Sequence, residues 1–147
     1  MAILSLSDHR HNLGLNIVHE FCWGFGFAFN DVSTILPLFL TLLGAPLSVV
    51  GSIAGVFAIL MAAPQLISAL MARNIRNLKM ATVKVHLTVL PPIFLAGFVF
   101  AFFSPTGPTA WIFYYVCFIL YSLSMGLIIT CWSTFLKLLT KRNTRGP

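Results

Sequence analysis

Charged side chains are scarce in this sequence. Only 8% of its 147 residues are Asp, Glu, Lys or Arg, whereas 59% are hydrophobic. Soluble domains carry about 25% charged residues. So few polar groups cannot cover the surface of a water-soluble domain of this length. The composition therefore argues against a soluble protein and predicts an all-α integral membrane protein, with residues 1–147 forming a single membrane domain.

The motifs of common enzymes and metalloproteins are also absent. The sequence contains no phosphate-binding loop, no H-E-x-x-H and no G-x-S-x-G. Its three cysteines show no paired spacing. We therefore expect a protein that is not an enzyme and that binds no metal and no cofactor.

Positive charge is present, and its placement points to lipid rather than to nucleic acid. The nine basic residues flank apolar runs instead of forming a basic face interleaved with exposed aromatics. Such flanking charges anchor a protein to an anionic membrane surface. We expect the lipid bilayer to be the partner of these residues and expect no nucleic-acid binding.

The run from Val32 to Ala72 contains 41 residues and no Asp, Glu, Lys or Arg. As one helix it would measure about 62 Å, twice the roughly 30 Å hydrocarbon core of a bilayer. The run must therefore turn, and Gly44-Ala45-Pro46 is where it can, because proline cannot continue a helix and glycine tolerates the backbone of a helix end. This stretch predicts a transmembrane helical hairpin.

The sequence predicts four transmembrane helices, at about residues 15–43, 47–72, 83–103 and 110–136. In the second helix, Gly51-x-x-x-Gly55 matches a small-residue pattern that allows close helix contact. The third helix contains Pro91-Pro92, which should bend it where a neighbour can satisfy the freed carbonyls. Residues 104–109, SPTGPT, form the second outer turn.

The basic residues also predict the orientation. One lies in the leader, four follow the second helix and four close the chain, whereas the turns GAPLS and SPTGPT carry none. By the positive-inside rule both termini are cytoplasmic. We therefore expect a multi-pass protein of the cell (cytoplasmic or inner) membrane.

The first helix has two different sides at 100° per residue. Its apolar side carries Val18, Phe21, Phe25, Phe29, Val32, Leu36, Phe39 and Leu43. Its polar side carries Asn16, Glu20, Trp23, Phe27, Asn30, Asp31, Thr34 and Thr41. A helix with a polar side in lipid turns that side toward a protein interior or a water-filled cavity.

Asp31 is the strongest single site candidate. It lies near the middle of the expected first helix, where an ionised Asp costs about 2.5–3.5 kcal/mol. Asn30 and Thr34 are its hydrogen-bonding neighbours, and Glu20 lies nearer the cytoplasmic end. One interpretation is that Asp31 binds a cation, a proton or a substrate group; the other is that it only fixes helix packing through a hydrogen bond.

The fourth helix carries aromatic residues at both of its ends. Trp111, Tyr114 and Tyr115 at one end and Trp132 at the other are typical of interfacial aromatic belts. Tyr121 lies between them and gives the helix a polar edge that can line a cavity. In the third helix, His86 is expected to snorkel or to be hydrogen-bonded.

The chain resembles the first four helices of a major facilitator superfamily (MFS) transporter. The resemblance rests on Gly24-Phe25-Gly26-Phe27, Leu36-Pro37-Leu38-Phe39, Leu43-Gly44, Gly51, Pro64-Gln65-Leu66 and the basic loop after the second helix. The family's loop motif, G-x-x-x-D-[RK]-x-G-[RK]-[RK], aligns with residues 68–77. Arg73 and Arg76 match it, whereas Ala72 stands where the motif has Asp.

The resemblance implies secondary active transport of a small solute, with the first and fourth helices lining the central cavity. It also implies that acids of the first helix couple transport to protons. Because the family fold has two six-helix halves, we expect a truncated or partial chain that self-associates or associates with a missing C-terminal part. Two alternatives stay open: a small four-helix oligomeric proton-coupled exporter, and a non-transporting membrane scaffold.

Overall fold

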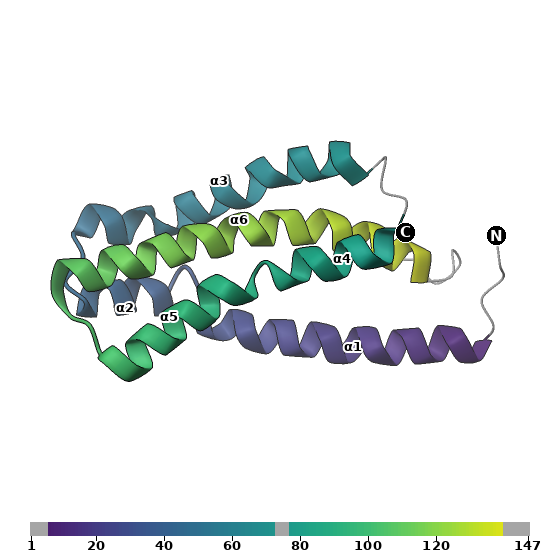
Figure 1. The fold of residues 1–147 in the computed structure, drawn as a ribbon, viewed down its shortest axis with the longest axis horizontal. Coiled ribbons are helices and arrows are strands. Elements are labelled where there is room, and N and C mark those ends of the chain that lie inside the picture. Colours follow the sequence, from purple (N-terminus) through teal and green to yellow (C-terminus); the bar gives the residue numbers. More distant parts are fainter. Residues whose placement is uncertain (1–5, 73–76, 140–147) are drawn as a thin grey trace.

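The computed structural model of the protein describes residues 6–72 and 77–139, and within these ranges every regular element is a helix (Figure 1). The helices are α1 (Leu6–Phe29), α2 (Ile35–Leu42), α3 (Leu47–Ala72), α4 (Leu78–Leu87), α5 (Leu90–Phe103) and α6 (Gly107–Leu139). The prediction of an all-α fold is confirmed. Arg73 and Arg76, the loop-motif residues, fall outside the described ranges.

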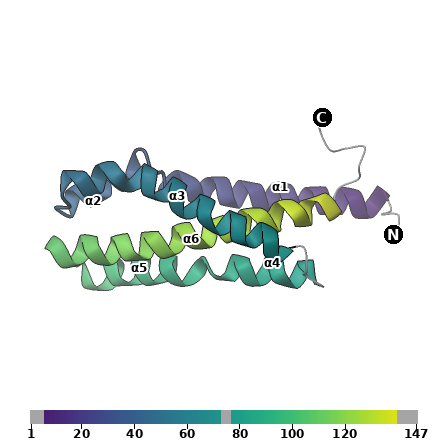
Figure 2. The same ribbon diagram turned by 90° about the horizontal axis from the view of Figure 1, so that it is seen from above.

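Helix α6 is the centre of the bundle. It packs against α3, α4 and α5, while α2 packs on α3. Figures 1 and 2 show α6 between α3 on one side and the α4–α5 pair on the other. The core follows this arrangement and consists of Leu36, Leu40, Ile53, Val89, Phe118, Tyr121, Met125 and Ile128. Half of these residues belong to α6.

The ends of the helices gather at the two ends of the bundle. The short turns α2–α3 and α5–α6 lie at one end, whereas α1 and α4 begin, and α3 and α6 finish, at the other (Figure 1). Gly44, with φ of 78°, and Gly107, with φ of 73°, adopt the left-handed backbone that these turns need. Both predicted turns are present, but the second is shorter than residues 104–109 because α6 begins at Gly107. The helices run up and down.

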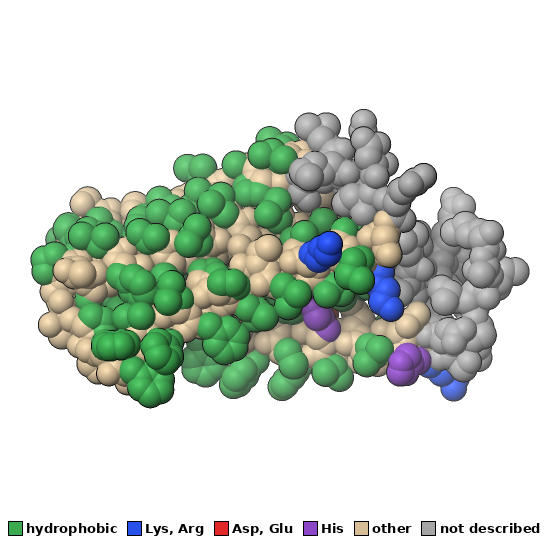
Figure 3. Space-filling view, viewed as in Figure 1, with side chains coloured by type: hydrophobic (Ala, Val, Ile, Leu, Met, Phe, Trp, Pro, Cys, Tyr) green, Lys and Arg blue, Asp and Glu red, His purple; other side chains and the backbone are tan. Residues whose placement is uncertain are grey.

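Three stretches of the described residues are long and apolar enough to cross a membrane. They are Leu47–Ile67, Leu78–Phe103 and Gly107–Lys137. Large apolar side chains cover much of the outer surface, as the green face of the space-filling view in Figure 3 shows. Leu47 is 83% exposed and Phe102 is 73% exposed. This surface is compatible with a membrane protein.

The expected first helix, residues 15–43, is wrong because it is two helices. The chain leaves the helical path after Phe29 and resumes it at Ile35. Pro37 explains the gap, since it has no N–H and its ring would clash with the carbonyl of Ser33 in a continuous helix. In the first turn of α2 the missing N–H costs nothing.

The helix is interrupted next to Pro91-Pro92, as predicted: α4 ends at Leu87 and α5 begins at Leu90, and the two residues between them keep right-handed helical backbone angles. Pro92 has no N–H for the carbonyl oxygen of Thr88, four residues earlier. The hydroxyl of Ser124 on α6 donates to that oxygen at 3.2 Å. The same hydroxyl also lies 2.9 Å from Leu120 O, so its one proton is shared between the freed carbonyl and the carbonyl of its own helix.

The close contact between α3 and α6 is formed at Gly126 and not at the predicted glycines. A Cβ atom at Gly126 would overlap the backbone carbonyl of Met61 and approach Pro64 Cγ to 3.1 Å. Gly51 and Gly55 have nothing within 4 Å of the Cβ position. The helix-contact prediction for the Gly51-x-x-x-Gly55 pattern is therefore wrong within this bundle, because α3 turns these glycines outward.

Candidate functional site

The polar side of α1 faces the bundle. Asn16, His19 and Trp23 are half-buried, whereas Phe21 is 73% exposed and Phe25 is 62% exposed on the outer side. The predicted two-sidedness is confirmed for α1. It is wrong for the part of the expected helix that becomes α2, where Leu36 is buried and Thr41 is exposed, because the break after Phe29 turns α2 relative to α1. The inward polar side meets the other helices at two cavities, one along α2, α5 and α6 and one along α4 and α6.

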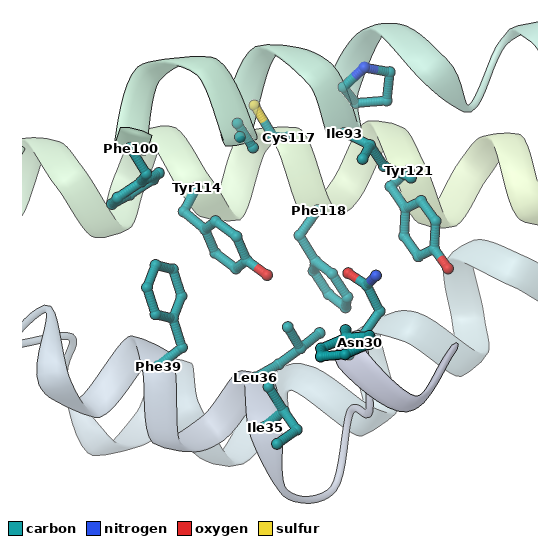
Figure 4. Close-up of a pocket in the computed structure, with 14 residues that line it drawn as sticks. Asn30, Ile35, Leu36, Phe39, Ile93, Phe100, Tyr114, Cys117, Phe118 and Tyr121 are labelled. Carbon is teal, nitrogen blue, oxygen red and sulfur yellow. The ribbon is translucent and has the colours of Figure 1, made fainter. Parts of the chain in front are cut away.

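The larger cavity, which we call the central cavity, has a volume of about 320 Å³. Helices α2, α5 and α6 and the last residues before the break after α1 form its walls (Figure 4). The lining is mostly aromatic and aliphatic and comprises Phe29, Asn30, Ile35, Leu36, Phe39, Pro92, Ile93, Ala96, Gly97, Phe100, Tyr114, Cys117, Phe118 and Tyr121. The volume lies at the lower end of the range for small-molecule sites.

Three neutral polar groups give the central cavity its hydrogen-bonding capacity. The Asn30 amide nitrogen donates to the Gly26 carbonyl at 3.2 Å, which leaves the amide oxygen as an acceptor. Figure 4 shows the Tyr114 hydroxyl and the Asn30 amide in the space between the helices. Among the described residues neither Tyr114 nor Tyr121 has a hydrogen-bond partner for its hydroxyl. The lining residues carry no charge, so the cavity suits a neutral, mostly apolar molecule.

Asp31 and Thr34 do not line the central cavity. Asp31 Oδ1 accepts hydrogen bonds from Ser33 N at 2.9 Å, Thr34 N at 2.7 Å and Thr34 Oγ1 at 2.8 Å. The carboxylate therefore stabilises the turn that precedes α2, whose N-cap residue is Thr34. The expected mid-helix position of Asp31 is wrong, and its coupling role stays a prediction.

The hydrogen bonds of this turn make a prediction for Asp31. Asp31→Asn keeps an oxygen that can accept the same bonds, so thermal stability in lipid nanodiscs should change little. Asp31→Ala removes the acceptor and should cost about 1 kcal/mol of unfolding free energy. Equal losses in both variants would contradict the role of these bonds in the turn. A transport defect in the stable Asp31→Asn protein would show that the charge itself is needed.

Glu20 and Trp23 belong to a second group of residues near the other end of α1. This histidine–tryptophan cluster comprises His19, Glu20, Trp23, His86 and Trp132 and borders a smaller cavity of about 150 Å³. Trp132 Nε1 donates to Glu20 Oε1 at 2.9 Å, and Trp23 Nε1 donates to His19 Nε2 at 2.8 Å. The expected site residues are thus divided: Asn30 and Tyr121 share the central cavity, and Glu20 and Trp23 share the cluster.

Sequence reasoning missed three residues of these sites. Tyr114, assigned to an aromatic belt, lines the central cavity, and its spacing from Phe118 and Tyr121 (i, i+4, i+7) was the signal for one helix face. Trp132, also assigned to a belt, binds Glu20. His86 is hydrogen-bonded to the Thr82 carbonyl as expected. Nothing in the sequence indicated that it lies beside α1.

Comparisons of the chain with protein-family models, with curated proteins and with solved structures give no match. The class of this protein is therefore described from its fold and its two cavities alone. The described chain is an all-helical protein with three stretches apolar enough to cross a membrane. It holds a neutral aromatic cavity in the bundle and a cluster of titratable residues beside that cavity.

Proposed function

We propose that this protein is a membrane transporter of the major facilitator type that carries a small, neutral, mostly apolar solute. The observation that carries the proposal is the central cavity, whose wall is formed by the segment around the α1–α2 break, by α5 and by α6. The α1–α2 segment, which contributes Asn30 and apolar side chains of α2, and α6 are the counterparts of the first and fourth helices that line the cavity in the resembling family. The lining residues supply aromatic surface and three neutral polar groups.

The proposal includes four crossings of the membrane. The segment α1–α2 is the fourth crossing beside the three apolar stretches, and it is broken at Asn30 and Asp31. Broken membrane helices occur where the irregular backbone lines a cavity. Asn30 lines the central cavity, so the position of the break supports this topology.

The proposed orientation places both termini in the cytoplasm of the cell. In Figure 3 the visible Lys and Arg side chains lie toward the end where α4 begins, and the opposite end is apolar or uncharged. Arg10, Lys79, Lys84 and Lys137 are the described basic residues, and the turns at the opposite end carry none. The positive-inside rule favours the basic end as the cytoplasmic one.

Neutral aromatic solutes test the proposed substrate class. Acetylnaphthalene, which has a carbonyl acceptor, should bind the protein in nanodiscs more tightly than naphthoate or naphthylmethylammonium, because the lining residues offer no counter-charge. Calorimetry with empty nanodiscs as the blank measures this preference. Preferred binding of the cation would instead favour the small exporter, and no binding of any of the three would favour the scaffold.

Two adjacent tyrosines provide a matched pair of variants. Tyr114→Phe removes a hydroxyl from the central cavity and should weaken acetylnaphthalene binding about fivefold, the value of one hydrogen bond of about 1 kcal/mol. Tyr115 instead shares a 3.0 Å hydrogen bond with Ser52 of α3, so Tyr115→Phe should leave this affinity unchanged. Ethylnaphthalene, which lacks the carbonyl, should bind both variants equally. An equal loss of acetylnaphthalene affinity in both variants would contradict the assignment.

A further inference from the structure

The central cavity is buried on one side and open on the other. Phe118 and Tyr121, which α6 contributes to the lining, are buried, so α6 forms the floor of the cavity. Phe29 and Ile35 on the α1–α2 wall and Ile93 on the α5 wall are between 41% and 62% exposed. Residues that line a cavity and are also exposed form its rim. The cavity therefore opens on the side that faces away from α6.

The two walls of the cavity touch at both ends and separate between them. Toward the short turns, the rings of Phe39 on α2 and Phe100 on α5 are 5.2 Å apart, on opposite walls in Figure 4. Toward the other end of the bundle, the rings of His19 on α1 and His86 on α4 are 5.5 Å apart. Between these contacts α5 packs closely against α6 but, in the part of the chain that the structure describes, not against α1 or α2. The opening is thus in the side of the bundle.

This opening, which we call the lateral window and define by its rim residues Phe29, Ile35 and Ile93, lies at the depth of the hydrocarbon core in the proposed topology. Ile93 belongs to the stretch Leu78–Phe103, which has 26 residues and is apolar enough to cross a membrane. At 1.5 Å per residue, Ile93 lies about 4 Å from the middle of that stretch. The hydrocarbon extends about 15 Å to either side of the bilayer centre. A window at this depth faces lipid chains and not water.

We propose that the central cavity takes its solute from the bilayer through the lateral window, and that the solute is a neutral lipophilic compound with one polar head. The head reaches the hydroxyl groups of Tyr114 and Tyr121 on α6, while an apolar tail stays among the lipid chains. The lining residues carry no charge, so such a compound moves from lipid into the cavity without losing a counter-charge. The identity of the solute rests on the proposed function, whereas the window itself does not.

A ligand with a long tail tests whether a bound solute extends through the lateral window. Dodecanoylnaphthalene has the ring and carbonyl of acetylnaphthalene and a longer alkyl chain, which the cavity of about 320 Å³ cannot hold together with the ring. If the chain passes through the window, both ketones should bind within about threefold of each other, expressed per mole fraction in the lipid. Their distribution between protein-containing and empty nanodiscs measures this. Normal binding of acetylnaphthalene with a loss of about tenfold or more for the tailed ketone overturns the window and leaves the proposed function intact.

A tryptophan at the rim should narrow the lateral window. Ile93→Trp should weaken binding of dodecanoylnaphthalene at least about tenfold relative to wild type, because the larger side chain occupies the path of the alkyl chain. Phe94→Trp is the matched control, since Phe94 is 69% exposed on the same helix and does not line the cavity. It should leave the affinity unchanged, and both variants should keep the wild-type thermal midpoint. Equal affinities in the two folded variants would contradict the place of Ile93 in the window.

Methyl NMR of the full chain in nanodiscs tests the lateral window without any solute. With carbon-13 in the isoleucine methyl groups, a lipid that carries a nitroxide at mid-chain should broaden the signals of Ile35 and Ile93, and a gadolinium chelate in the water should not. Ile53, which is 1% exposed, should be broadened by neither. Signals of Ile35 and Ile93 that behave like Ile53, or that broaden with the chelate, overturn the window. Broadening by the lipid without binding of either ketone overturns the proposed function and leaves the window supported.

Discussion

Replacing Gly97 with leucine is expected to weaken acetylnaphthalene binding at least about tenfold, or about 1.4 kcal/mol. Gly97 lies on α5 in the wall of the central cavity, and nothing is within 4 Å of the position its Cβ would take. The leucine side chain therefore fits without disturbing the helices and occupies space that the solute needs. Because the free volume is only about 320 Å³, four added carbon atoms remove a large part of it.

Gly55→Leu is the matched control for the Gly97 variant. Gly55 is also a helical glycine with nothing within 4 Å of its Cβ position, but it lies on α3 and lines neither cavity. Both variants should keep the wild-type thermal midpoint in nanodiscs, and only Gly97→Leu should lose affinity in calorimetric titration. Unchanged affinity in a folded Gly97→Leu protein would mean that the solute binds elsewhere.

A leucine at Gly126 is expected to destabilise the bundle by about 3 kcal/mol or more. The Cβ atom would overlap the Met61 carbonyl and approach Pro64, and a backbone group cannot move aside as a flexible side chain can. Helices α3 and α6 would have to separate, and α6 is the helix on which α3, α4 and α5 pack. The loss should be seen as a lower thermal midpoint and as aggregation on size-exclusion chromatography.

The same control separates the contact at Gly126 from a general effect of losing glycine. Gly55→Leu and Gly126→Leu make the same chemical change in neighbouring helices, but only the second meets a backbone atom. Similar thermal midpoints for Gly126→Leu and wild type would show that α3 and α6 do not approach each other as closely as described here.

Most of the helices were predictable because the positions of proline and glycine and the length of each apolar run determine where a helix begins and ends. The expected helix at residues 47–72 has the bounds of α3, and the one at 110–136 falls within α6. The turn at Gly44 follows from the need for a left-handed residue before Pro46. The helix break at Pro91-Pro92 also follows from local chemistry, since neither residue can donate a backbone hydrogen bond.

The break after α1 was missed because hydrophobic periodicity runs through it without interruption. Asp31, Ser33 and Thr34 are residues that begin helices, and Pro37 is favoured in the first turn of a helix. These local signals predict a helix start near Ile35. The expectation of a single long helix outweighed them, so Asp31 was placed inside a helix, whereas it lies in the turn before α2.

The sites were predictable only where a single helix defines them. The inward side of α1 follows from its own residues, which is why Asn30, Glu20 and Trp23 were identified. Their partners depend on how α4 and α6 pack against α1. Nothing in the sequence near His86 or Trp132 indicates that His86 approaches His19 or that Trp132 bonds Glu20, because both contacts are set by tertiary packing.

Photolabelling tests most directly that the central cavity binds the solute. A diazirine derivative of acetylnaphthalene is irradiated with the wild-type protein in nanodiscs, and the adducts displaced by excess acetylnaphthalene are mapped by mass spectrometry. We expect displaceable adducts on cavity residues such as Phe29, Ile93 and Tyr114. Displaceable adducts confined to outward-facing residues such as Leu47 and Leu66, with none in the cavity, would contradict the assignment of a solute site to this bundle.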